Sequence, residues 1–157
     1  MVRIGIICPS EIAFRRFLPA LQKANNKVEF TAIGIASPQE WFGDLSKVTV
    51  EQIEEQQSRE CAKAQTFIDQ YGGKIIVGYE ALISSEDIDA VYLPLPPALH
   101  FHWAQKALEG GKHVFLEKPS TTCLKDTDAL IRIASQKGLA LHENYMFIYH
   151  NQLETIQ

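Results

Sequence analysis

The chain has 157 residues, of which 46% are hydrophobic and 22% are charged, with a formal net charge of −4. This length corresponds to about one domain with its own core, and the composition excludes a disordered or fibrous chain. Without a dense basic cluster, nucleic acid is not an expected partner. The three cysteines lack metal-ligand spacing, and no apolar run has membrane length. We therefore expect a cytoplasmic protein with no bound metal and no membrane contact.

The N-terminal segment predicts a strand followed by a helix. Residues 2–8 (VRIGIIC) form a continuous apolar run, which is typical of a strand buried on both faces of a parallel sheet. A helical face follows at Ala13, Phe14, Phe17, Leu18 and Leu21. Pro19 lies inside this pattern and predicts a kink or two short helices. In a dinucleotide-binding fold, the turn between strand and helix would hold the pyrophosphate on free backbone N–H groups.

The next segment predicts a second strand and then a loop. Residues 28–36 (VEFTAIGIA) are rich in β-branched and aromatic residues. An acidic residue at the end of this strand would hold the adenosine ribose, and an arginine would favour a 2′-phosphate. Ser37-Pro38-Gln39 supplies neither, so NAD and NADP both stay open. Residues 38–48 show no period and predict a loop, in which Trp41 and Phe42 either shield the adenine or anchor the loop to its own domain.

The middle of the chain alternates helix and strand patterns. Thr49 opens a capping box with Gln52 and predicts a helix that runs to Tyr71 and ends at Gly72. Short strands are predicted at residues 75–77 and 89–93, with a helical turn at residues 79–83 between them. A proline-bearing loop covers residues 94–100, and an amphipathic helix follows at residues 101–109.

Residues 110–119 (GGKHVFLEKP) contain the leading functional candidate. Gly110 and Gly111 end the preceding helix, and residues 113–116 predict a buried strand. Glu117 and Lys118 stand where this strand emerges, at the edge where open α/β sheets bind their ligands. The alternative is that the two residues are a solvated pair before a loop.

The C-terminal part predicts one more helix and a sixth strand. Thr121 or Thr122 is expected to cap a helix that ends before Gly138, and residues 139–141 are expected to form the strand. Six strands alternating with helices, in β-first order, predict an α/β fold with a three-layer, doubly wound parallel sheet of the Rossmann type.

The order of helix, Gly-Gly, apolar strand and Glu-Lys-Pro resembles the N-terminal domain of the glucose-fructose oxidoreductase, inositol dehydrogenase and rhizopine catabolism (Gfo/Idh/MocA) family. The loop at residues 94–100 also resembles this family, because His100 keeps the expected place, although Pro97 replaces a common asparagine. Aligned with the family's first strand, Cys8 and Ser10 replace two glycines of the dinucleotide fingerprint, and Ala13 fits its last small position. Ser10 can still cap the helix and offer a hydroxyl to a phosphate.

The resemblance implies an oxidoreductase that transfers a hydride between NAD or NADP and a sugar or polyol. Lys118 would be the catalytic residue, polarising the reacting oxygen, and Glu117 would orient Lys118 or contact the nicotinamide ribose. The cofactor-binding candidates are Cys8, Pro9, Ser10, Glu11, Ile12, Ser37, Leu93, Pro94, Leu95, His100, Glu117 and Lys118. For His100, packing at the helix start is an equal alternative.

The resemblance also implies a domain division. Residues 1–145 are expected to form the NAD(P)-binding domain, and residues 146–157 to begin the crossover to a C-terminal substrate domain that this chain does not contain. The chain alone is therefore expected to be inactive, and an exposed apolar face to favour a homo-oligomer. The competing hypotheses are a non-catalytic Rossmann-like module that regulates or binds a protein, and a nucleotide-sugar carrier on the same fold.

Overall fold

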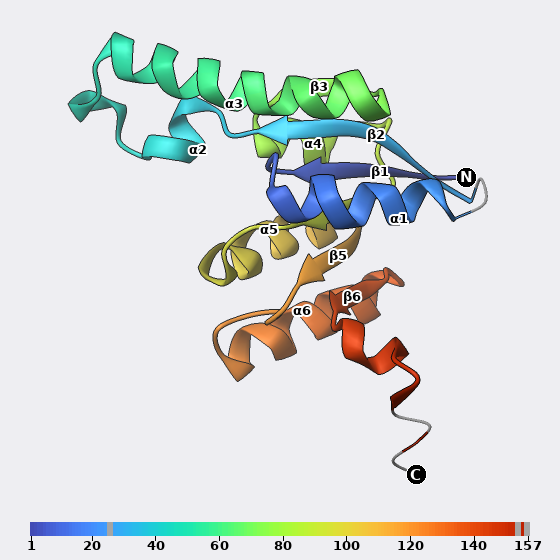
Figure 1. Cartoon of the computed structure of the whole chain (residues 1–157). Helices are drawn as coiled ribbons and strands as arrows, with labels where there is room; N and C mark the ends of the chain where they lie inside the picture. Colours follow the sequence, from blue (N-terminus) through green and yellow to red (C-terminus); the bar gives the residue numbers. More distant parts are fainter. Residues whose placement is uncertain (25–26, 153–154, 156–157) are drawn as a thin grey trace.

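A computed structural model describes residues 1–24, 27–152 and 155. Six strands form one parallel sheet in the order β3-β2-β1-β4-β5-β6 (Figure 1). The strands are β1 (Val2–Ile7), β2 (Val28–Ile35), β3 (Lys74–Val77), β4 (Ala90–Leu93), β5 (His113–Glu117) and β6 (Leu141–Asn144). The helices are α1 (Leu18–Gln22), α2 (Pro38–Phe42), α3 (Val50–Tyr71), α4 (Tyr79–Ser84), α5 (Pro97–Glu109) and α6 (Leu124–Lys137).

The centre of the sheet is buried on both faces, as the apolar run of β1 predicts. Successive side chains of a strand point to opposite faces, so Ile6 and Ile7 enter different cores. Ile6 packs in the core under α1 and α3, together with Leu18 and Phe67. Ile7 packs in the core under α4, α5 and α6, together with Leu108. The predicted three-layer, doubly wound architecture is therefore confirmed.

The strand order reverses between β1 and β4, and this places the site. Chain connections run outward from β1 to β2 and β3 on one side, and from β4 to β5 and β6 on the other. At such a switch point the loops after β1 and β4 diverge and leave room for a ligand. The candidate residues on both loops therefore share one edge of the sheet.

The helix after β1 contains the irregularity that Pro19 predicts. Residues 11–22 are continuously helical, but Ala13–Phe17 form a π-helical turn in which the Leu18 N–H donates to the Ala13 carbonyl. Pro19 follows at the start of α1. Because proline lacks an N–H and crowds the carbonyl four residues earlier, a wider turn before it keeps the helix continuous.

The prediction of a loop at residues 38–48 is wrong, because α2 lies there together with a 3-10 turn at Leu45–Lys47. Ser37 caps α2 in a capping box with Glu40, and Pro38 occupies the first helical turn. Capping and a first-turn proline are sufficient signals for a helix this short, whereas periodicity is not visible over one turn.

The C-terminal elements are shifted from their predicted positions. The residue before α6 is Cys123, which makes no side-chain cap, so neither Thr121 nor Thr122 is the cap. The Thr121 hydroxyl is instead 2.7 Å from the Cys123 carbonyl and 2.7 Å from the Thr127 hydroxyl. Strand β6 begins at Leu141 rather than at residue 139. Leu141 is the first of its residues to pair with β5, opposite Val114. Among the described residues, no helix is long and apolar enough to cross a membrane.

Candidate functional site

The turn after β1 keeps a glycine-like backbone without its glycines. Cys8 has φ of 81°, the only positive value of a non-glycine residue in the part of the chain that the structure describes. Its N–H donates to the Gly34 carbonyl at 3.1 Å, which continues the β1–β2 ladder into the turn. The Ser10 hydroxyl accepts a hydrogen bond from the Ala13 N–H at 3.2 Å, so Ser10 caps the helix as predicted.

The Cys8 side chain points inward and is not a reactive thiolate. Burial raises the pKa of the thiol, and a hydrogen bond with the Tyr79 side chain only partly offsets this effect. Burial, together with the neighbouring Cys8, also raises the pKa of the Tyr79 hydroxyl. Both groups therefore stay protonated at neutral pH, and Cys8 contributes its backbone rather than its sulfur to the site.

The end of β2 is built around a carboxylate that the sequence analysis did not single out. Glu40 Oε2 accepts hydrogen bonds from the N–H groups of Ser37 at 2.8 Å and Tyr79 at 2.9 Å, and Oε1 accepts from Glu80 at 3.0 Å. Glu40 therefore ties the loop after β2 to the first turn of α4. The Ser37 hydroxyl accepts from the Glu40 N–H at 3.3 Å, which leaves its own proton free to donate to a ligand.

Helix α3 brings buried polar side chains to the same edge. The Gln57 amide donates to the Ala36 carbonyl at 2.8 Å and to the Gln56 side chain at 2.7 Å. Gln56 is 1% exposed, and its own Nε2 has no partner among the described residues. Glu60, 4% exposed, pairs with Lys63 at 2.8 Å. This cluster lies beside the adenosine end of a dinucleotide fold, and helix periodicity alone does not reveal it.

The loop after β4 offers backbone rather than side chains. Leu93 and Leu95 are buried in the core, and Pro94 is half-buried. His100, on the first turn of α5, is fully buried. Its Nε2 lies 2.7 Å from the Leu95 carbonyl and its Nδ1 lies 2.9 Å from the Pro119 carbonyl. The ring therefore links the loops after β4 and β5, and both nitrogens are used by the protein.

Glu117 ends β5 and is held from both sides. Its Oε1 accepts a hydrogen bond from the Tyr92 hydroxyl at 2.5 Å and another from the Asn144 amide at 2.7 Å. Tyr92 comes from β4 and Asn144 from β6, so the carboxyl ends of three neighbouring strands meet at one oxygen. Polar residues at the ends of β4 and β6 were the available sequence signal, but only strand order makes them neighbours.

Lys118 is exposed, while the residues around it are fixed. Glu117, the residue before it, accepts hydrogen bonds from Tyr92 and Asn144. The carbonyl of Pro119, the residue after it, is within hydrogen-bond distance of His100. The N–H of Ser120 donates to the Glu143 carboxylate at 2.8 Å. A cationic side chain on a loop fastened at Glu117, Pro119 and Ser120 is suited to polarising an oxygen at a defined position.

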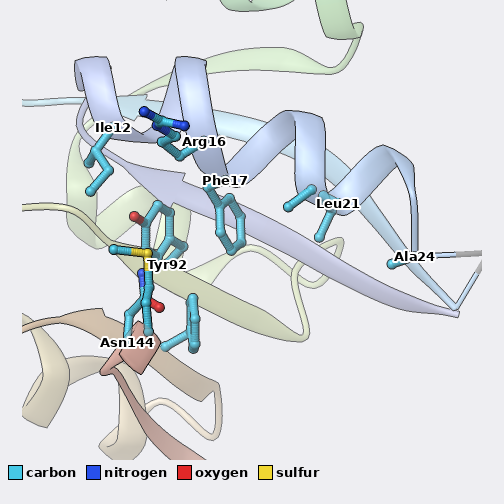
Figure 2. Close-up of a pocket in the computed structure, with 10 residues that line it drawn as sticks. Ile12, Arg16, Phe17, Leu21, Ala24, Tyr92 and Asn144 are labelled. Carbon is cyan, nitrogen blue, oxygen red and sulfur yellow. The ribbon is translucent and has the colours of Figure 1, made fainter. Parts of the chain in front are cut away.

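The structure gathers the predicted residues along one edge. The turn at residues 8–12, Ser37, the loop after β4 and the pair Glu117–Lys118 follow the carboxyl ends of β1, β2, β4 and β5. A cavity of about 380 Å³ lies between the helix after β1 and the ends of β4 and β6, bordered by Ile12, Tyr92 and Asn144 (Figure 2). Among the described residues, no group of three or more His, Cys, Asp or Glu side chains could hold a metal ion.

Comparisons with known proteins agree with this geometry. The sequence model of the oxidoreductase family with an NAD-binding Rossmann fold matches residues 2–145. The chain is 39% identical over 151 residues to dTDP-3,4-didehydro-2,6-dideoxy-alpha-D-glucose 3-reductase of Actinomadura kijaniata, covering 96% of this chain and 38% of that protein. It is 36% identical over 156 residues to the enzyme of the same name from Saccharopolyspora spinosa, covering 99% and 40%.

Solved structures show the same fold. KijD10, a 3-ketoreductase from Actinomadura kijaniata in complex with NADP and TDP-benzene, matches with a TM-score of 0.78 and 37% identity. That match covers 99% of this chain and 40% of KijD10. The WlbA dehydrogenase in complex with NADH and UDP-GlcNAcA matches with a TM-score of 0.77 at 19% identity, which supports the fold alone. The chain thus spans about two fifths of the length of the first relatives.

Proposed function

Because this chain belongs to the Gfo/Idh/MocA oxidoreductase family with an NAD-binding Rossmann fold, we propose that it is the NADP-binding part of a sugar-nucleotide ketoreductase. The family resemblance drawn from Glu117-Lys118-Pro119 is thereby confirmed. The reductase assignment is supported by the relatives, which are named as reductases of a dTDP-linked sugar. The single observation that carries the proposal is the exposed Lys118 on a loop fastened to three neighbouring elements.

The residues after β1 and β2 fit a bound dinucleotide. The N–H groups of Glu11 and Ile12 at the helix start have no acceptor among the described residues, and they suit a pyrophosphate oxygen. The Ser37 hydroxyl can donate to the adenosine ribose or its phosphate. NADP is proposed over NAD because KijD10 was solved with NADP.

The proposed reaction reduces a ketone on the sugar to an alcohol. When bound, the reduced nicotinamide supplies a hydride to the carbonyl carbon. The Lys118 ammonium donates a hydrogen bond to the carbonyl oxygen, stabilises the negative charge that develops there and delivers the proton that completes the hydroxyl. The fastened loop holds Lys118 in place, so little reorganisation is needed as the charge develops.

We also propose a division of the chain. Residues 1–145 form the cofactor-binding domain, and residues 146–157 begin the connection to a domain that binds the sugar nucleotide. The extent of the family match, at residues 2–145, and the greater length of the relatives support this division. The substrate pocket and full activity then belong to the longer protein.

Calorimetric titration of the chain with NADPH and NADH tests the proposal. The expected result is micromolar binding of NADPH and weaker binding of NADH. Failure of both nucleotides to bind would favour a non-catalytic Rossmann-like module, because Cys8 and Ser10 would then have abolished the phosphate grip. Binding of dTDP alone would favour a nucleotide-sugar carrier.

A further inference from the structure

The carboxylate of Glu117 is anchored through one oxygen. Oε1 accepts hydrogen bonds from Tyr92 and Asn144, and neither bond uses Oε2. We propose that Tyr92 and Asn144 are positioning residues, which turn the carboxylate so that Oε2 accepts a hydrogen bond from a ribose hydroxyl of the nicotinamide cofactor. This inference rests on the proposed function and names two residues that the sequence comparison with the family does not assign.

Tyr92 is held rigidly enough for this task. The residue is fully buried, and its ring stacks on Phe17 with centroids 3.9 Å apart and planes 17° apart. Its ring also packs against Phe115 of β5, at a centroid distance of 5.5 Å. Figure 2 shows Phe17 reaching from the helix toward Tyr92, with Asn144 on the other side of the tyrosine. The hydroxyl is thus fixed relative to β5 before any ligand binds.

The two anchors can only donate to Glu117. Burial raises the pKa of the Tyr92 hydroxyl, as does its hydrogen bond to Glu117, so this group keeps its proton at neutral pH. The contacting atom of Asn144 is the amide nitrogen, which has no acceptor capacity. Two donors on one oxygen fix the plane of the carboxylate and therefore the direction of Oε2.

A purely structural role for these bonds is the alternative. Asn144 pairs with Glu117 in the β5–β6 register, and Tyr92 pairs with Phe115 in the β4–β5 register, so the bonds also hold the strand ends together. Such a role would lower stability when a donor is lost but would leave cofactor affinity unchanged in the folded protein. The test therefore measures affinity and stability separately.

Tyr92→Phe removes the hydroxyl and keeps the ring. We expect it to weaken NADPH binding to the chain about tenfold, because Oε2 is then no longer directed at the ribose and the proposed hydrogen bond from the ribose hydroxyl to this charged group is lost. The matched control is Tyr71→Phe, which removes a tyrosine hydroxyl that donates to the Phe14 carbonyl at 3.1 Å, away from Glu117. This control is expected to change the NADPH dissociation constant less than about twofold. Asn144→Ala removes the second donor to Glu117 and takes the place of Tyr92→Phe as the test variant if Tyr92→Phe does not fold.

The double variant distinguishes positioning from general weakening. In a Glu117→Gln background, Tyr92→Phe is expected to cause no further loss of NADPH affinity, because the group that it positions is already altered. Equal affinities of Tyr92→Phe and Tyr71→Phe, or a full tenfold effect of Tyr92→Phe in the Glu117→Gln background, would overturn the inference. Absence of NADPH binding to the unaltered chain would instead remove the proposed function, and with it this inference.

Discussion

The imidazole of His100 is bonded to the backbone carbonyl of Pro119, with Nδ1 2.9 Å from the oxygen, while its other nitrogen faces the carbonyl of Leu95. A carbonyl oxygen only accepts hydrogen bonds, so a neutral ring can donate to one of these partners and a doubly protonated ring to both. His100 was a candidate for direct cofactor contact. From these two contacts we propose that the ring acts at least in part indirectly, by holding the loops after β4 and β5 together.

Replacing His100 by phenylalanine should destabilise the protein. The change removes the ring nitrogens that face the Leu95 and Pro119 carbonyls, so at least one buried hydrogen bond is lost, and we expect a loss of about 1–3 kcal/mol in the free energy of unfolding. Urea unfolding measures this loss. The control is His102→Phe, because His102 is exposed on the same helix and should change the free energy little. Equal stabilities of the two variants would contradict the role assigned to His100.

Replacing Cys8 by glycine should stabilise the turn after β1. At φ of 81°, a side chain with a Cβ is strained, and glycine removes that strain. The control is Cys8→Ala, which removes the sulfur but keeps the Cβ. We expect the glycine variant to be more stable than the alanine variant by about 1 kcal/mol in thermal unfolding. We also expect it to bind NADPH more tightly, because the backbone can approach the phosphates more closely.

Removing the Glu40 carboxylate should loosen the end of β2. Glu40→Ala leaves the N–H groups of Ser37, Tyr79 and Glu80 without their acceptor, and we expect a loss of about 1–3 kcal/mol in the free energy of unfolding. Glu86→Ala, at an exposed glutamate, is the control for the charge change. NADPH affinity should also fall, since Ser37 is no longer fixed. Stability equal to that of Glu86→Ala would show that water can replace the Glu40 carboxylate as the acceptor for these N–H groups.

Lys118→Ala should abolish turnover without affecting the fold. The Lys118 side chain is exposed, so its loss is expected to change thermal stability by less than about 0.5 kcal/mol. In the proposed two-domain reductase, the rate of NADPH oxidation with the proposed substrate, a dTDP-linked keto sugar, should fall by at least about 100-fold. Lys125→Ala, at an exposed lysine of α6, is the control. Turnover within threefold of the control would remove Lys118 from the mechanism.

The Arg3–Asp89 pair predicts a pH dependence of stability. Arg3 donates to Asp89 from its backbone and its guanidinium, at 2.7 to 3.0 Å, which holds the pKa of the Asp89 carboxyl well below its usual range. A lowered pKa in the folded state means that this stabilisation is present above the unfolded pKa of about 3.9 and is lost as the pH falls further.

Asp89→Asn is the variant that tests this pair. At pH 7 it should lower the midpoint of thermal unfolding modestly, since both side chains are about a third exposed. The difference from the unaltered chain should shrink below about pH 4. Asp128→Asn makes the same charge change at an exposed site and should show no such convergence. A difference independent of pH would exclude the ionic contribution.

The alternation of strands and helices and the strong helix caps could be predicted from the sequence. The 22-residue helix α3 has the predicted cap at Thr49 and ends at Gly72, because each of these signals is local. Strands β1 to β5 lie where they were predicted, since their runs are largely apolar, whereas β6, with the sequence LHEN, shares only Leu141 with its prediction. Helix α2 was missed because five residues are too few to show a helical period.

The residues that support Lys118 were less predictable. Lys118 follows a strand and could be singled out by its position in the chain. Tyr92 and Asn144 lie 25 and 27 residues from Glu117, so their contacts depend on strand order and register. The same holds for Glu40, which meets Tyr79 at a separation of 39 residues. A sequence pattern marks which groups are polar, but the fold decides which of them meet.

The π-helical turn before Pro19 also bears on how this chain compares in length with other proteins. A turn of this kind holds one residue more than an α-helical turn between the same two ends. A homologue that lacks this residue could therefore keep both Ser10 at the helix start and Leu18 in the core, with an ordinary α-helix between them. A single-residue deletion within residues 13–17 is thus expected to be tolerated, whereas a deletion inside α3 would rotate its buried face away from the sheet.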